Sequence, residues 1–189
     1  MKQSRIIPLY LLFIFSSLTL TDAYGQNPLL RQLAKEDQDA RTGKTIARTD
    51  AERVKIVLSV IAQGEVKDPE DKFDAAIVLQ HTPLAIREKQ VVAISPDNYL
   101  LAHYLFKSAF EAGYERARFL VAASIDRYLS FTEGYQLYGT NRIVNQETEK
   151  EELVPIDRKT SDAERAKYGV HPLADLLKQY PEQAPRKKP

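Results

Sequence analysis

The sequence predicts a mainly α-helical fold, a compact bundle of antiparallel helix hairpins similar to those of helical-repeat proteins. Apolar residues recur at helical spacing along most of the chain after residue 27. Helix start signals, in which Thr, Asp or Ser is followed by Pro or by a Glu three positions on, stand before several of these segments. Only residues 134–156 are enriched in Tyr, Val, Ile and Thr, so a short β-hairpin or loop insertion is expected there.

The first half of the chain is predicted to hold three helices. Residues 28–41 carry an apolar stripe of leucines. The next helix begins at the capping box Thr49–Glu52, in which side chain and backbone of the two residues satisfy each other, and it ends near Gly64. The third opens with Asp68-Pro69 and extends to about His81 through a continuous apolar run, so it should be deeply buried.

The second half continues the pattern. Ser95-Pro96 starts a helix that ends at Gly113, and residues 114–130 form another with close to ideal helical spacing. Because only Gly113 separates them, these two helices should form an antiparallel hairpin. A second capping box at Ser161 starts a short helix that ends near Gly169, and residues 172–180 form the last helix.

The N-terminal segment has the three parts of a secretory signal peptide, with Lys2 and Arg5 before an apolar run and small residues at 23 and 25. We expect cleavage before Gln26; the alternative is an uncleaved anchor helix, for which the apolar run is short. The domain prediction is a signal peptide at 1–25, a single helical domain at 26–181 and a flexible basic tail at 182–189. Export without any cysteine favours the bacterial periplasm or the extracellular space.

The charge balance of the chain limits the classes of partner that it is expected to bind. The chain has 27 Lys plus Arg and 26 Asp plus Glu, and removal of 1–25 takes away two cations and one anion, which leaves 25 of each. A neutral chain has no bulk attraction for nucleic acid, and we expect membrane contact only through the signal segment during export. The absence of cysteine and of paired histidines gives no signature of a metal site, and no cofactor is predicted.

The candidate catalytic residues are His81, Asp126 and Arg127. His81 lies on an apolar stripe, and Asp126-Arg127 interrupts the best amphipathic helix with two charges. The candidate ligand-binding residues begin on the loop that follows, a glycine-containing segment able to present amides and hydroxyls. They are Gln136, Tyr138, Gly139 and Thr140.

The order of these and other polar residues along the chain also resembles the pattern of a known family. Asp37-Gln38 with Arg41, Gln80-His81, Asp126-Arg127, Gln136-x-Tyr138-Gly139-Thr140 and Glu164-Arg165 with Gly169 occur in that order. This order resembles a family of bacterial proteins known only as a domain of unknown function, over about residues 35–180. The chain departs from that pattern at Asn141, where the family usually has Gln. The resemblance implies that the quoted polar residues, Asp37, Gln38 and Arg41 included, form one site or one structural network.

Three functions fit these observations. The first is a binding or interaction module in the cell envelope, with an envelope protein, peptide or polymer as partner, and the sequence favours it. The alternative is a hydrolase-like enzyme in which Asp126 orients His81 as an acid or base, Arg127 holds an anionic group, and the 138–140 loop stabilises developing negative charge. In the third, His81 and Asp126 form a buried structural pair while Arg127 binds the carbonyls of the loop.

Overall fold

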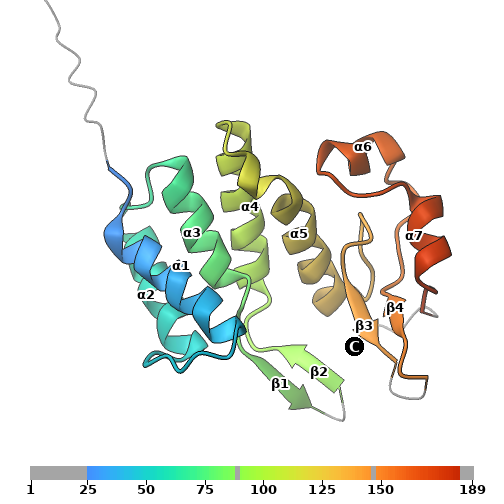
Figure 1. The fold of residues 1–189 in the computed structure, drawn as a ribbon, viewed down its shortest axis with the longest axis horizontal. Coiled ribbons are helices and arrows are strands. Elements are labelled where there is room, and N and C mark those ends of the chain that lie inside the picture. Colours follow the sequence, from blue (N-terminus) through green and yellow to red (C-terminus); the bar gives the residue numbers. More distant parts are fainter. Residues whose placement is uncertain (1–24, 88–89, 146–147, 184–189) are drawn as a thin grey trace, which may run out of the picture.

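The computed structural model describes residues 25–87, 90–145 and 148–183, and it is mainly helical, as predicted (Figure 1). Its seven α-helices agree with the expected segments to within a few residues, and the 3-10 turn η1 (Glu115–Ala117) precedes the fifth. The helices are α1 (Pro28–Arg41), α2 (Asp50–Ala62), α3 (Pro69–Leu79), α4 (Asp97–Glu111), α5 (Arg118–Thr132), α6 (Asp162–Lys167) and α7 (Leu173–Gln179).

Local signals set several helix starts. At α2 the Thr49 side chain accepts from the Glu52 amide while the Glu52 carboxylate accepts from the Thr49 amide, which is the predicted capping box. Pro69 is the first residue of α3, where its missing amide hydrogen costs nothing. At α6 the Ser161 hydroxyl accepts from the Glu164 amide.

The helices form a row in which α3 packs against α1, α2 and α4, and α4 packs against α5 (Figure 1). The predicted hairpin around Gly113 is the α4–α5 pair. α3 is the most deeply buried helix, with seven of its residues inside the core. Phe73 of α3 meets Phe106 of α4 edge to face at 5.7 Å between ring centroids, which places the centre of the core between these two helices.

Two antiparallel hairpins accompany the helices. The predicted insertion contains β3 (Arg142–Val144) paired with β4 (Glu151–Leu153). The other hairpin, β1 (Leu84–Arg87) with β2 (Gln90–Ala93), was not predicted. Its strands have four residues each, too short for a periodic pattern to stand out, and its connection lacks the Asn-Gly or Asp-Gly that usually marks such a turn.

The two ends of the chain test the domain boundaries only in part. The predicted signal peptide lies outside the described residues apart from Gly25. Residues 184–189 of the expected flexible tail lie outside the described residues, and at its start the Gln183 amide donates to Leu153 O and the Glu182 carboxylate accepts from the Ile156 amide. This stretch therefore adds to the edge of β4. No helix among the described residues is long and apolar enough to cross a membrane.

Candidate functional site

His81 forms a hydrogen-bonded dyad with Asp37, a residue 44 positions away in the sequence. α3 ends at Leu79, and the turn that follows places His81 Nδ1 at 2.5 Å from Asp37 Oδ2 of α1. The Asp37 side chain is 1% exposed and that of His81 is 20% exposed. No other hydrogen bond to the His81 ring is found within the described part of the chain, so Nε2 is available to a ligand or water.

Basic side chains surround the carboxylate of this dyad. Asp37 Oδ1 lies 3.7 Å from Arg41 Nη2 and 3.9 Å from Arg53 Nη2, and both guanidiniums hydrogen-bond to Asp50. Gln38 Nε2 donates to Asp37 Oδ2 at 3.0 Å. Asp37 Oδ1 itself is buried and accepts no hydrogen bond. The carboxylate is thus held by charge and by its second oxygen, with acceptor capacity left over. We refer to Asp37, Gln38, Arg41, Arg53 and His81 as the Asp37 cluster.

Arg53 is a member of this cluster that the sequence reasoning missed. Its side chain is 1% exposed although it carries a charge. A signal was available, because Arg53 falls at i and Val57 and Val60 at i+4 and i+7 on the buried stripe of α2. A cation on an apolar stripe requires an anion behind it, and here the anions are Asp50 and Asp37.

Arg127 lies beside the dyad and has no carboxylate partner within ion-pair distance in the described residues. Its Nη1 donates to the backbone oxygen of Gln80 at 3.2 Å and to the side-chain oxygen of Gln80 at 3.4 Å, and Gln80 directly precedes His81. Burial lowers the pKa of the Arg127 guanidinium, with Tyr99 acting in the opposite direction. Arginine keeps its proton under such conditions, so a partly buried positive charge stands next to His81.

Asp126 belongs to a different network. One of its oxygens accepts from the amides of Leu137 and Tyr138, and the other accepts from the amide and the hydroxyl of Thr140 and from the amide of Gly139, all at 2.7–3.0 Å. The carboxylate is completely buried. Burial raises the pKa of the Asp126 carboxyl, and the donating amides and hydroxyl of the loop oppose that rise.

Arg165 and Gln136 complete this second network. Arg165, 1% exposed, donates from Nε to Tyr138 O and from Nη2 to Leu137 O, each at 3.2 Å. The fully buried Gln136 side chain donates to Asn141 O and Val154 O and accepts from the Asn141 amide. Asp126, Gln136, residues 137–140 and Arg165 are named the Asp126 lock, because they hold the loop on both its amide and its carbonyl side.

Three expectations about these residues are therefore wrong. His81 does not pair with Asp126, because the Asp126 carboxylate is occupied by the loop. The Gly139 amide is not free to stabilise a developing charge, because it donates to Asp126. The carbonyls of the loop are bound by Arg165 rather than by Arg127, which points to Gln80. Asp126 and Arg127 are neighbours, yet about 100° of rotation per helical residue turns them toward different partners.

The expected ligand-binding residues divide in the same way. Gln136, Tyr138, Gly139 and Thr140 are built into the Asp126 lock, and Tyr138 and Gly139 are buried. Burial raises the pKa of the Tyr138 hydroxyl strongly, and its neighbours Tyr168 and Glu164 add to the rise. The other expected group, namely Asp37, Gln38 and Arg41, meets His81 in the Asp37 cluster.

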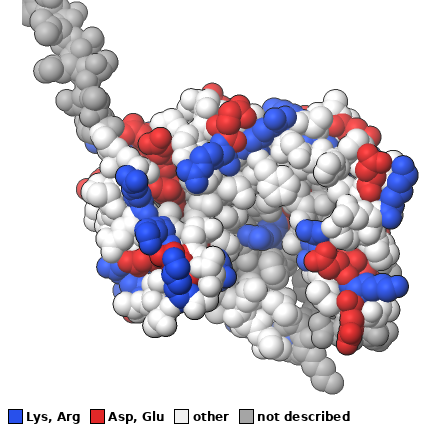
Figure 2. Space-filling model, in the orientation of Figure 1, with Lys and Arg blue, Asp and Glu red and all other residues white. Residues whose placement is uncertain are grey.

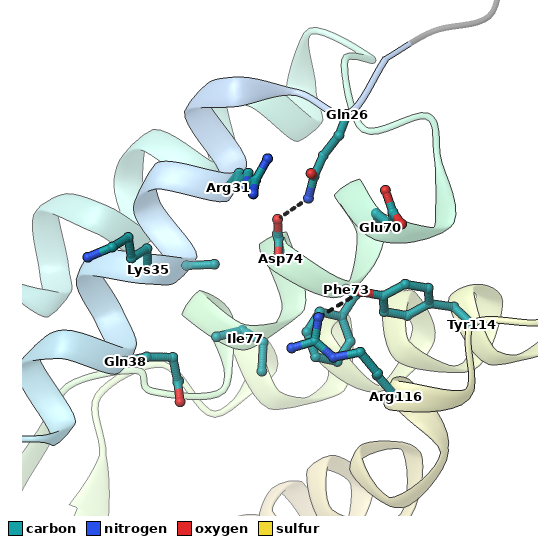
Figure 3. A pocket seen from close by; sticks show the side chains of 11 residues that line it. Gln26, Arg31, Lys35, Gln38, Glu70, Phe73, Asp74, Ile77, Tyr114 and Arg116 are labelled. Carbon is teal, nitrogen blue, oxygen red and sulfur yellow. Dashed lines mark hydrogen bonds between the residues drawn. The ribbon is translucent and has the colours of Figure 1, made fainter.

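A groove of about 530 Å³ lies between α1 and α3 (Figure 3). Its walls follow helical spacing, with residues 31, 34, 35 and 38 from α1 and residues 70, 73, 74 and 77 from α3. Gln26, Tyr114 and Arg116 complete the lining. At one end Gln38 both lines the groove and donates to Asp37, and His81 follows one helical turn after Ile77. The groove therefore meets the Asp37 cluster at Gln38.

The described residues contain no group of three or more His, Cys, Asp or Glu side chains placed to hold a metal ion. On the face shown in Figure 2, basic and acidic side chains lie interspersed. Comparison of the chain with models of known protein families, with curated proteins and with solved structures found no match. The resemblance to a bacterial family of unknown function stays a prediction, and the site has to be interpreted from its geometry.

Proposed function

We propose that this protein is an exported acid–base enzyme of the hydrolase type, with His81 as the catalytic base and Asp37, instead of the expected Asp126, as its orienting carboxylate. The observation that carries the proposal is the 2.5 Å contact between His81 Nδ1 and a buried carboxylate, while Nε2 has no hydrogen-bond partner among the described residues. A carboxylate on Nδ1 fixes the imidazole tautomer that has its lone pair on Nε2, which is the arrangement of a general base.

The reaction follows from these positions. His81 Nε2 removes a proton from a water molecule, and the resulting hydroxide forms a bond to the carbonyl carbon of an ester or amide. When the tetrahedral intermediate breaks its bond to the leaving group, the imidazolium returns the proton to that group, so one water is consumed and an acid and an alcohol or amine are released. Arg127, which forms no ion pair in the part of the chain that the structure describes, would bind an anionic group of the substrate.

A binding module of the cell envelope is the second candidate, and the groove between α1 and α3 favours it. In that function the groove holds an envelope peptide or polymer, and the dyad only fixes the end of α3 against α1. The two candidates differ in whether His81 Nε2 reacts.

The test uses protein exported from a bacterial host, with its N-terminus determined by mass spectrometry, and p-nitrophenyl acetate as the probe. We expect His81→Asn to lower the esterase rate by about 10²–10⁴-fold, the usual contribution of a positioned acid–base group. The matched control is His171→Asn, which removes an exposed histidine and should leave the rate unchanged. Equal rates for wild type and His81→Asn, with both proteins folded, would support the binding module instead.

Asp37 is a positioning residue, and its role has a readout besides the rate. In wild type, ¹⁵N NMR of the neutral His81 ring should show the proton on Nδ1, where Asp37 accepts it. Asp37→Asn should redistribute the tautomers, because an amide can also donate to the ring. A tautomer ratio that does not change would sink the positioning role of Asp37.

A further inference from the structure

The groove between α1 and α3 contains two arginines that form no ion pair within the described residues. Arg31 of α1 and Arg116 of η1 lie within ion-pair distance of no carboxylate among the described residues. In Figure 3 they extend into the groove from opposite walls, with Asp74 between them. The Arg116 guanidinium lies 4.9 Å from the centre of the Phe73 ring and donates to the Tyr114 hydroxyl, so its position is fixed without an anion.

Asp74, one of the two acidic residues that line the groove, already accepts a hydrogen bond from a protein group. Asp74 Oδ2 accepts from Gln26 Nε2 at 2.8 Å, and burial raises the pKa of the Asp74 carboxyl, with Gln26 and the charge of Arg116 opposing the rise. The charge of Arg116 acts on Asp74, but within the described residues neither Arg31 nor Arg116 forms an ion pair, so both guanidiniums keep donors for a ligand. A polyanion such as nucleic acid is disfavoured by Asp74 and Glu70 in the same lining, whereas a single carboxylate brings only one negative charge to the two arginines.

The length of the groove matches that of a short extended peptide. From Arg31 to Gln38 the axis of α1 advances by ~10 Å at 1.5 Å per residue. An extended peptide covers that length with about three residues, at ~3.3 Å each. The side-chain amide of Gln38, at the far end, is of the kind that pairs with a peptide backbone, and His81 follows directly beyond it.

We propose that this groove binds the last three or so residues of an extended peptide, with the terminal carboxylate bound by Arg31 and Arg116 and the chain running past Gln38 toward His81. This inference rests on the function proposed above, since it names the substrate class of the same site. A bond about three residues from the carboxyl end would then be presented to His81 Nε2.

Fluorescence polarisation of an N-terminally fluorescein-labelled pentaalanine tests this proposal. The peptide is used with a free carboxylate and as its C-terminal amide. We expect the acid to bind about tenfold more tightly than the amide, the difference that one charge-assisted contact makes. Arg31→Met and Arg116→Met should each weaken binding of the acid about tenfold and remove the preference over the amide. At position 116 methionine keeps an apolar stem over Phe73, so that folding is preserved.

The matched control is Arg158→Met, which changes an exposed arginine away from the groove and should leave binding unchanged. His81→Asn should bind the peptide as wild type does, so a failure of catalysis and a failure of peptide binding are distinguished. Equal affinity for acid and amide, or affinity that survives the loss of both arginines, would overturn the proposal. Competition by acetate or inorganic phosphate as strong as by unlabelled pentaalanine would do so too, since it would reveal an anion site with no role for the chain.

Discussion

Two buried aspartates of this molecule have opposite surroundings. Asp126 accepts five hydrogen bonds from one loop, which use both of its oxygens. Asp37 accepts from His81 and Gln38 on one oxygen, while the other accepts none. A fully satisfied carboxylate stabilises one conformation and offers nothing to a ligand. A carboxylate that is partly satisfied and orients a partly exposed histidine leaves groups available to a ligand, so the Asp37 cluster is the better candidate for chemistry.

The largest expected effect comes from breaking the Asp126 lock. Asp126→Ala should lower the free energy of unfolding by about 3–5 kcal/mol, because four amides and a hydroxyl lose their acceptor in a buried place. Urea denaturation followed by circular dichroism measures the change. Asp175→Ala, which removes an exposed carboxylate, should stay within about 0.5 kcal/mol. A loss below ~1 kcal/mol for Asp126→Ala would contradict the assignment of this network as structural.

A smaller effect is expected from Gly139→Ala in the same loop. Gly139 has a φ of 94°, and a Cβ added there would lie 2.7 Å from Leu176 Cδ1 and 3.1 Å from Ile156 Cδ1. Backbone strain and crowding together should destabilise the protein by about 2–4 kcal/mol.

Gly64→Ala is the matched control for this prediction, because Gly64 has a φ of 71° but nothing within 4 Å of an added Cβ. It should cost only about 1 kcal/mol, the strain of the left-handed backbone. Thermal melts of the two variants give the comparison. Equal losses would show that the 137–140 loop gives way to the methyl group and is less tightly packed than the Asp126 lock implies.

The smallest effect distinguishes His103, which packs against another helix, from the exposed His171. His103 of α4 bonds through Nδ1 to Val121 O, and burial lowers its pKa although that bond opposes the shift. As the pH falls through about 6.5, the unfolded chain binds a proton that folded His103 resists, so the free energy of unfolding should decrease. His103→Asn should flatten this pH dependence in urea titrations, and the exposed His171→Asn should not. An unchanged slope in His103→Asn would mean that another group causes it.

The secondary structure was predictable because its determinants are local. The capping box at Thr49, Pro69 at the start of α3 and the glycine between α4 and α5 each act within a few residues, and the structure shows the elements they predict. The hairpin of β1 and β2 escaped prediction because two four-residue strands contain too little pattern to be distinguished from a loop. The importance of Asp126 was also visible, since a carboxylate on an apolar helix face needs donors.

The pairing of the polar residues was decided only by the tertiary structure. His81 can meet a carboxylate from α1 or from α5, and the sequence places both at similar distances along the chain. Packing of α3 directly against α1 brought Asp37 to His81, while the loop after α5 folded back onto Asp126. The sequence by itself determined which polar and charged side chains lie on otherwise apolar helix faces. Which of them meet depends on how helices far apart in sequence turn toward one another, and that is a property of the packed core.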